Sequence, residues 1–131
     1  TLLVTASLLD LNHSMQVALK INLKTRMIEE AGATILKAPL KICDSTTDLL
    51  KGLEGLVLER GINKHLVRVL AHENGCTHLY ELALNAVRLC FGVMVGMQFD
   101  WNEWISKSVS DVEFVKIAKP HLEGSCRPFK K

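Results

Sequence analysis

The sequence has few aromatic residues and little net charge. Aromatic residues make up 5% of the 131 residues, and the formal net charge is +2. No run of basic residues is longer than the terminal pair Lys130-Lys131. Proteins that bind nucleic acids need basic patches or aromatic stacking platforms. We therefore expect no nucleic-acid partner.

A long hydrophobic run and an export signal are also missing. The longest apolar run, Leu89 to Met97, has nine residues, which is about half of a membrane span. Residues 1–11 are apolar but lack a basic start and a small-residue cleavage site. We expect no membrane association and a cytoplasmic location, where cysteines are more often thiols or metal ligands than disulfides.

The sequence contains none of the common phosphate-binding or nucleophile motifs. The patterns G-x-x-x-x-G-K-[ST], G-x-G-x-x-G and G-x-S-x-G do not occur. Whether the protein is an enzyme is therefore uncertain, and a non-enzymatic role is favoured.

The first third of the chain has the pattern of a β-meander. Apolar residues occupy the odd positions from Met15 to Leu23, which is typical of a strand with one solvated face. The segments Leu2–Leu9 and Met27–Leu36 can flank it, with a bulge at Gly32. Residues 1–38 are thus predicted to form three antiparallel strands.

Beyond Pro39 the hydrophobic period becomes helical. Residues 44–97 are predicted to hold three helices, which begin at Asp44 or Ser45, at Asn63 and near Thr77; the first ends near Arg60. Residues 98–131 are predicted to hold a last helix, Asp111–Ala118, stopped by Pro120, and a coil tail. The segment Asp100–Trp104 has no assigned role. Strands followed by helices predict a single α+β domain over residues 1–131, with the helices on one face of the sheet.

Four cysteines and five histidines carry the chemistry of this sequence. Cys76 and His78 lie at a predicted helix start, where unpaired backbone amides favour a thiolate. His13 has the parity of the inward strand positions, and Cys43 lies at a strand-to-helix junction. Together His13, Cys43, Cys76 and His78 form a candidate Cys2His2 site for zinc or iron, with Cys126 as a reserve ligand. The alternative is that these cysteines pack in the core and the histidines make ordinary hydrogen bonds.

The other cysteine and histidines have simpler interpretations. Cys90 falls on the apolar stripe of the third predicted helix and is expected in the core. His65 and His72 lie among charged neighbours and are expected to face solvent, while His121 is left undecided.

Four short blocks resemble a bacterial family that is known as a domain of unknown function. The blocks are His13-x-Met15, Pro39-x-x-x-Cys43, Gly75-Cys76-Thr77-His78-Leu79-x-Glu81-Leu82 and Gly124-Ser125-Cys126. The third is the most specific of the four, and the resemblance covers the chain from about Leu3 to Cys126.

A more distant similarity is to the NifU-type scaffold proteins of iron–sulfur cluster assembly. It implies a NifU/SufE-like fold in which His13 stands where the scaffold has an aspartate, and Cys43 and Cys76 stand at two of its cysteines. This sequence lacks the scaffold's first cysteine, and its histidine follows the late cysteine instead of preceding it.

Three functions from different classes follow from these observations. The first is a metal-binding protein, for zinc or iron, in metal or iron–sulfur handling. The second is a non-catalytic interaction module with an unknown protein partner and structural cysteines. A third is a thiol-based transferase that uses Cys76. The oligomeric state is not predicted.

Overall fold

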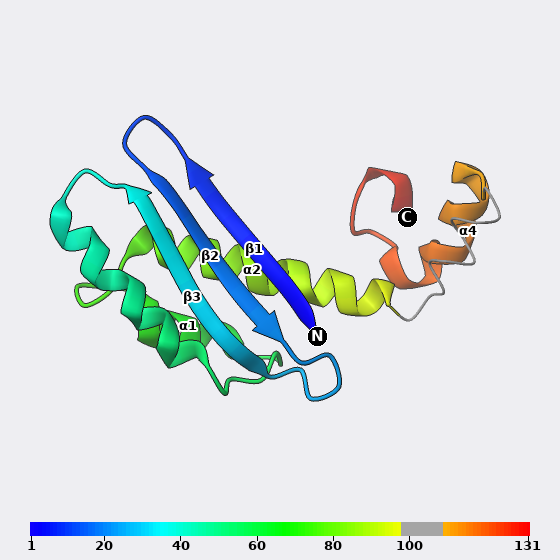
Figure 1. Ribbon diagram of the computed structural model, residues 1–131. Coiled ribbons are helices and arrows are strands. Elements are labelled where there is room, and N and C mark those ends of the chain that lie inside the picture. Colours follow the sequence, from blue (N-terminus) through cyan, green and yellow to red (C-terminus); the bar gives the residue numbers. More distant parts are fainter. Residues whose placement is uncertain (98–108) are drawn as a thin grey trace. The chain divides into compact units, whose positions relative to one another are not determined.

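The computed structural model describes residues 1–97 and 109–131 (Figure 1). The segment Asp100–Trp104 lies outside these residues. The chain divides into two compact units, Thr1–Gly92 and Val93–Lys131. The arrangement is α+β, as the sequence predicts, with strands first and helices afterwards. None of the helices in the described ranges is both long and apolar enough to cross a membrane.

The first unit contains a three-stranded antiparallel meander. Strands β1 (Leu2–Leu9), β2 (Ser14–Ile21) and β3 (Ile28–Lys37) follow in the order β1-β2-β3. The prediction of a bulge at Gly32 is wrong, because Gly32 pairs in register with Ala18 and the register shifts lie at the two ends of β2. Strand β1 ends, β2 begins and β3 ends at the same end of the sheet. The segments that connect these strand ends therefore lie close together.

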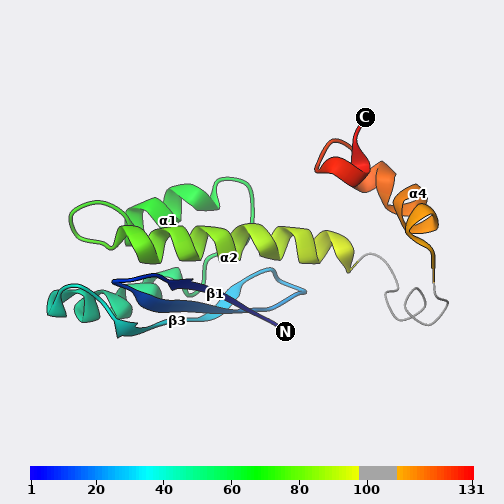
Figure 2. The ribbon, with the colours of Figure 1, turned by 90° about the horizontal axis from the view of Figure 1, so that it is seen from above.

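Helices cover one face of this sheet. Figure 2 shows α1 (Ile62–Leu70) and α2 (Thr77–Gly96) on the same side of the strands. The inward side chains of β2, from Met15 to Ile21, are at most 3% exposed. The hydrophobic core of the unit also includes Leu50, Leu53, Leu58, Ile62, Leu66, Leu70, Leu79, Leu82, Ala83, Ala86, Val87 and Cys90.

The segment after β3 differs from the helix that the sequence predicts. It is a 3-10 helix, η1 (Lys41–Leu53), which packs along β3. The hydroxyls of Ser45, Thr46 and Thr47 each donate to the carbonyl three residues earlier, and such bonds compete with α-helical ones. The predicted end near Arg60 is also wrong, because η1 ends at Leu53 and Val57 forms an isolated bridge with Met27, the residue before β3.

The predicted start of the second helix is also corrected. Helix α1 is preceded by Gly61 at φ 98°, and not by Asn63. The Asn63 side chain instead accepts a hydrogen bond from the Tyr80 hydroxyl at 3.0 Å. Because Asn63 holds α2 in this way, its polar side chain still has a structural role.

The second unit includes α4 (Asp111–Leu122) and a short 3-10 turn, η2 (Arg127–Phe129). Ser110 and Glu113 form a reciprocal capping box at the start of α4. Pro120 lies inside the last turn and does not stop the helix at Ala118. Proline lacks the N–H for the bond to the carbonyl four residues earlier and crowds that carbonyl, yet α4 continues to Leu122, and the Glu123 N–H donates to the Lys119 carbonyl. Ala118 and Phe129 are buried in this unit.

Candidate functional site

The turn between β1 and β2 is organised by the carboxylate of Asp10. Its Oδ1 atom accepts the backbone N–H groups of Asn12 and His13, both at 2.7 Å, and its own N–H donates to the His13 carbonyl at 3.0 Å. The bond from the Asn12 amide, and then the bond from the His13 side chain, hold the pKa of Asp10 below its usual value. Asp10 is therefore a carboxylate at neutral pH.

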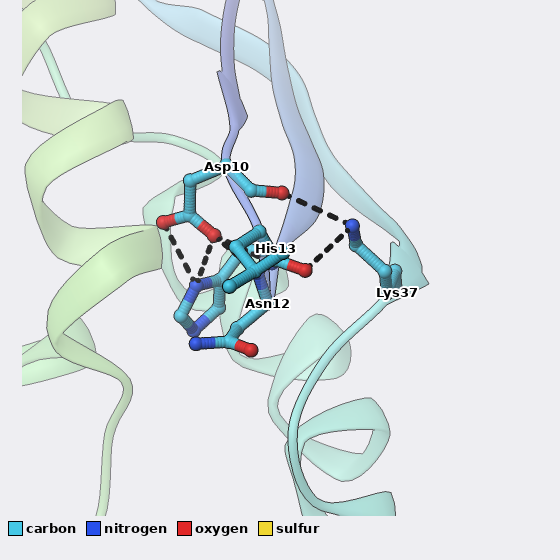
Figure 3. A network of polar contacts seen from close by, with 5 residues as sticks. Asp10, Asn12, His13 and Lys37 are labelled. Atoms are coloured by element: carbon cyan, nitrogen blue, oxygen red, sulfur yellow. Dashed lines mark hydrogen bonds and ion pairs between the residues drawn. The ribbon is translucent and has the colours of Figure 1, made fainter.

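The same carboxylate binds the imidazole ring of His13 (Figure 3). The His13 Nδ1 atom lies 3.0 Å from Asp10 Oδ1 and 3.1 Å from Oδ2. The His13 side chain is 13% exposed. A neutral imidazole that donates from Nδ1 keeps its lone pair on Nε2. The turn thus orients His13, and in the neutral ring that donates from Nδ1 the Nε2 atom carries the lone pair that a metal ion would take.

A second histidine lies against His13. The rings of His13 and His78 have centroids 4.1 Å apart and are tilted by 42°. His78 is half-buried in the first turn of α2. The inward parity of His13 predicts that it meets the helices, and its contact with His78 is consistent with that expectation.

Gly75 brings α2 to this position. The Cys76 N–H donates to the Leu70 carbonyl at 2.8 Å, which closes the loop from α1 onto the end of that helix. A Cβ at residue 75 would lie 2.0 Å from the Leu70 oxygen. Only glycine fits there, which gives a physical reason for the Gly75 of the Gly-Cys-Thr-His block.

Lys37 ties the end of β3 to the same turn. Its ammonium group donates to the Asp10 carbonyl at 3.0 Å and to the Leu11 carbonyl at 2.9 Å (Figure 3). A second strand end thus holds the turn that orients His13.

The four cysteines, none of which is in a disulfide, differ in burial. Cys43 and Cys76 are half-buried, in the first turn of η1 and just before α2. Cys90 is buried as predicted, and desolvation raises the pKa of its thiol to about 11. Cys126 is exposed and belongs to the second unit. Cys43 and Cys76 therefore remain the thiols to consider beside the histidines.

The structure brings together only part of the predicted ligand set. His13 and His78 are in contact. Within residues 1–97 and 109–131, no three side chains of His, Cys, Asp or Glu form a group that could hold a metal ion. His65 and His72 are exposed, as predicted. The donor chemistry around His13 fits a metal ligand, while the complete four-residue site stays a prediction.

Sequence reasoning missed Asp10 and Lys37. Asp10 stands three residues before His13 in a predicted turn, and this spacing is the signal that could have found it, since turn aspartates commonly accept following backbone N–H groups. Lys37 left no comparable signal, because its partners are backbone carbonyls 26 and 27 residues away.

Comparison with known proteins gives a family match. Residues 9–92 match the model of a family described as "Protein of unknown function (DUF2889)". No curated protein and no solved structure matches the chain. The matched range contains the whole β1–β2 turn, Cys43, and the first turn of α2.

Proposed function

Because the chain belongs to the DUF2889 family, whose description names no function, we propose one from the site itself. The protein binds a transition-metal ion, zinc or iron, at His13 and His78, and takes part in metal or iron–sulfur handling. The observation that carries this proposal is the pair of contacts made by His13, to the Asp10 carboxylate on one side and to the His78 ring on the other. Histidines that bind metals usually donate their other ring N–H to a carboxylate or a carbonyl.

Adjoining segments of the chain also offer thiols, whose deprotonated form zinc and iron accept as a ligand. Cys76 lies two residues before His78. Cys43 lies six residues after Lys37, and the Lys37 side chain donates to the Asp10 carbonyl in the β1–β2 turn. Neither thiol is sealed in the core as Cys90 is. We propose that a bound ion draws one or both of these thiolates toward the two imidazoles, because three donors are not yet grouped in the described part of the chain.

The test is a metal titration of the full, untagged chain. Protein stripped of metal and titrated with Co²⁺ is expected to take up about one equivalent, with visible ligand-field bands and a thiolate charge-transfer band. His13→Ala and His78→Ala should each abolish these bands. Replacing exposed His65 with alanine should leave them unchanged. Failure of the wild type to bind Co²⁺, Zn²⁺ or Fe²⁺ under reducing conditions would rule the proposal out.

The second candidate is the interaction module, which one observation favours. Large apolar side chains are exposed at the end of the sheet where the site lies. They are Leu9 at 79%, Leu11 at 88%, Leu36 at 82%, Leu40 at 64% and Ile42 at 73% exposure. Exposed apolar groups that gather in this way often mark contact surfaces. If this is the main function, Leu11→Ser with Leu36→Ser will abolish partner capture, and His13→Ala will leave it intact.

A further inference from the structure

Strand β1 is an edge strand with one neighbour. It pairs with β2 from Leu2 to Leu9 without a register shift, and within the described residues no element pairs with its other side. On the opposite edge of the sheet, η1 packs along β3. The N–H and C=O groups on the outer side of β1 are therefore the open hydrogen-bonding edge of this sheet.

Nothing in β1 blocks strand pairing. The eight residues Leu-Leu-Val-Thr-Ala-Ser-Leu-Leu contain no charge and no proline. Protected edge strands usually carry a lysine, a proline, a bulge or an inward charge, and β1 has none of these. An edge of this length and polarity is suited to binding another strand.

The sequence of β1 is complementary to itself in one antiparallel register. When two copies are related by a two-fold axis at Ala6, Leu3 of each lies opposite Leu9 of the other, and Thr5 lies opposite Ser7. Leu3 and Leu9 are 68% and 79% exposed, and both lie on the face away from the helices. This register therefore covers both ends of the strand with apolar pairs.

The other face of the strand is matched as well. In the same register Val4 lies opposite Leu8, and Ala6 meets its own copy. Val4, Ala6 and Leu8 are the half-buried, helix-side positions of β1, because successive side chains point to opposite faces. The residue at the two-fold axis is alanine, so its two copies meet on that face without crowding.

We propose that β1 pairs with β1 of a second copy of this chain in this register, which joins two meanders into one six-stranded sheet. An isologous contact of this kind closes on itself, because residue i contacts j and j contacts i. The remaining edge, at β3, is next to η1. The assembly therefore stops at a dimer, and it does not depend on whether the histidine site binds metal.

The test measures the mass of the full chain by sedimentation velocity and light scattering over roughly a hundredfold range of concentration. The wild type is expected to be a dimer that dissociates reversibly on dilution. The double variant T5K/S7K sets lysines opposite lysines at two places and should weaken the dimer by about tenfold or more. Both positions are exposed in the monomer, so the fold is retained, and circular dichroism checks this.

A matched variant tests the register. T5K/S7E replaces the same two residues but sets a lysine opposite a glutamate at both places, so the dimer should persist and be weakened by salt. In the neighbouring antiparallel register, Thr5 faces its own copy and T5K/S7E would fail. A wild type that is monomeric throughout, that grows beyond a dimer, or whose dimer responds alike to both variants overturns the proposal. If β1 instead pairs with a strand from another protein or with another segment of this chain, the wild type will be monomeric throughout.

Discussion

Gly75 and Leu70 approach each other so closely that the first cannot carry a side chain. A Cβ at residue 75 would meet the Leu70 carbonyl oxygen at 2.0 Å and its carbon at 2.4 Å. Both are backbone atoms at the end of α1, so neither can rotate away. The start of α2, and with it His78, depends on this contact.

Gly75→Ala is therefore expected to destabilise the first unit strongly. We expect a loss of about 3 kcal/mol or more in the free energy of unfolding, measured with urea. Gly92→Ala is the matched control, because its Cβ would meet nothing within 4 Å and alanine stabilises a helix by up to about 1 kcal/mol. Similar effects of the two substitutions would contradict this account of the loop.

Asp10→Asn should change how stability depends on pH. The pKa of Asp10 is lowered in the folded chain, so its ionised form stabilises the fold above the unfolded value of about 3.9. That contribution is lost as the pH falls through the lowered value. The stability difference between wild type and Asp10→Asn should thus be present at pH 7 and shrink below about pH 4. Urea unfolding across this range measures it; a difference that grows in acid would contradict the assignment.

Asp10→Asn also tests whether Asp10 only orients His13 or binds the metal ion itself. If His13 binds a metal, Asp10→Asn should weaken Co²⁺ binding by about 10–100-fold without abolishing it, whereas His13→Ala should abolish it. Equal loss in both variants would mean that Asp10 is itself a ligand.

Lys37→Met should loosen the β1–β2 turn without changing the core. It removes two hydrogen bonds to backbone carbonyls and should cost about 1 kcal/mol in the free energy of unfolding. Lys64→Met, at an exposed position on α1, is the control and should stay within about 0.5 kcal/mol. Hydrogen exchange of the Asn12 and His13 amides should quicken only in the first variant.

The cysteines should react in the order of their exposure. Cys126 is exposed, Cys43 and Cys76 are half-buried, and Cys90 is buried with its pKa raised to about 11. Iodoacetamide at about pH 8 should therefore label Cys126 first and leave Cys90 unmodified in the native protein. Peptide mass spectrometry reads the order, and early labelling of Cys90 would show that the core opens.

The sheet was predictable because the pattern that determines it lies in residues that are neighbours in the sequence. Alternation of apolar and polar residues determined that Met15 faces the core, and the structure begins β2 one residue earlier and ends it at Ile21. The end of β2 was less predictable, because the Asn22 side chain accepts the amides of Lys24 and Thr25 and starts the turn early.

The helices and the site were less predictable because their determinants are not local. The hydroxyl bonds that accompany the 3-10 geometry of η1 depend on which rotamers Ser45 and Thr46 adopt. The parity of His13 indicated its direction, yet its contact with His78 joins residues that are 65 positions apart. Asp10 could have been found from its spacing, whereas Lys37 required the folded sheet.

The Asp10 carboxylate couples the closure of the β1–β2 turn to the orientation of His13. The oxygen that accepts the two turn amides also holds the imidazole. By linkage, any ligand that binds His13 only in this orientation must stabilise the turn by the same free energy that the turn contributes to binding. The stability of the β1–β2 turn therefore reports whether the histidine pair is occupied, even for a ligand that has no colour and undergoes no reaction.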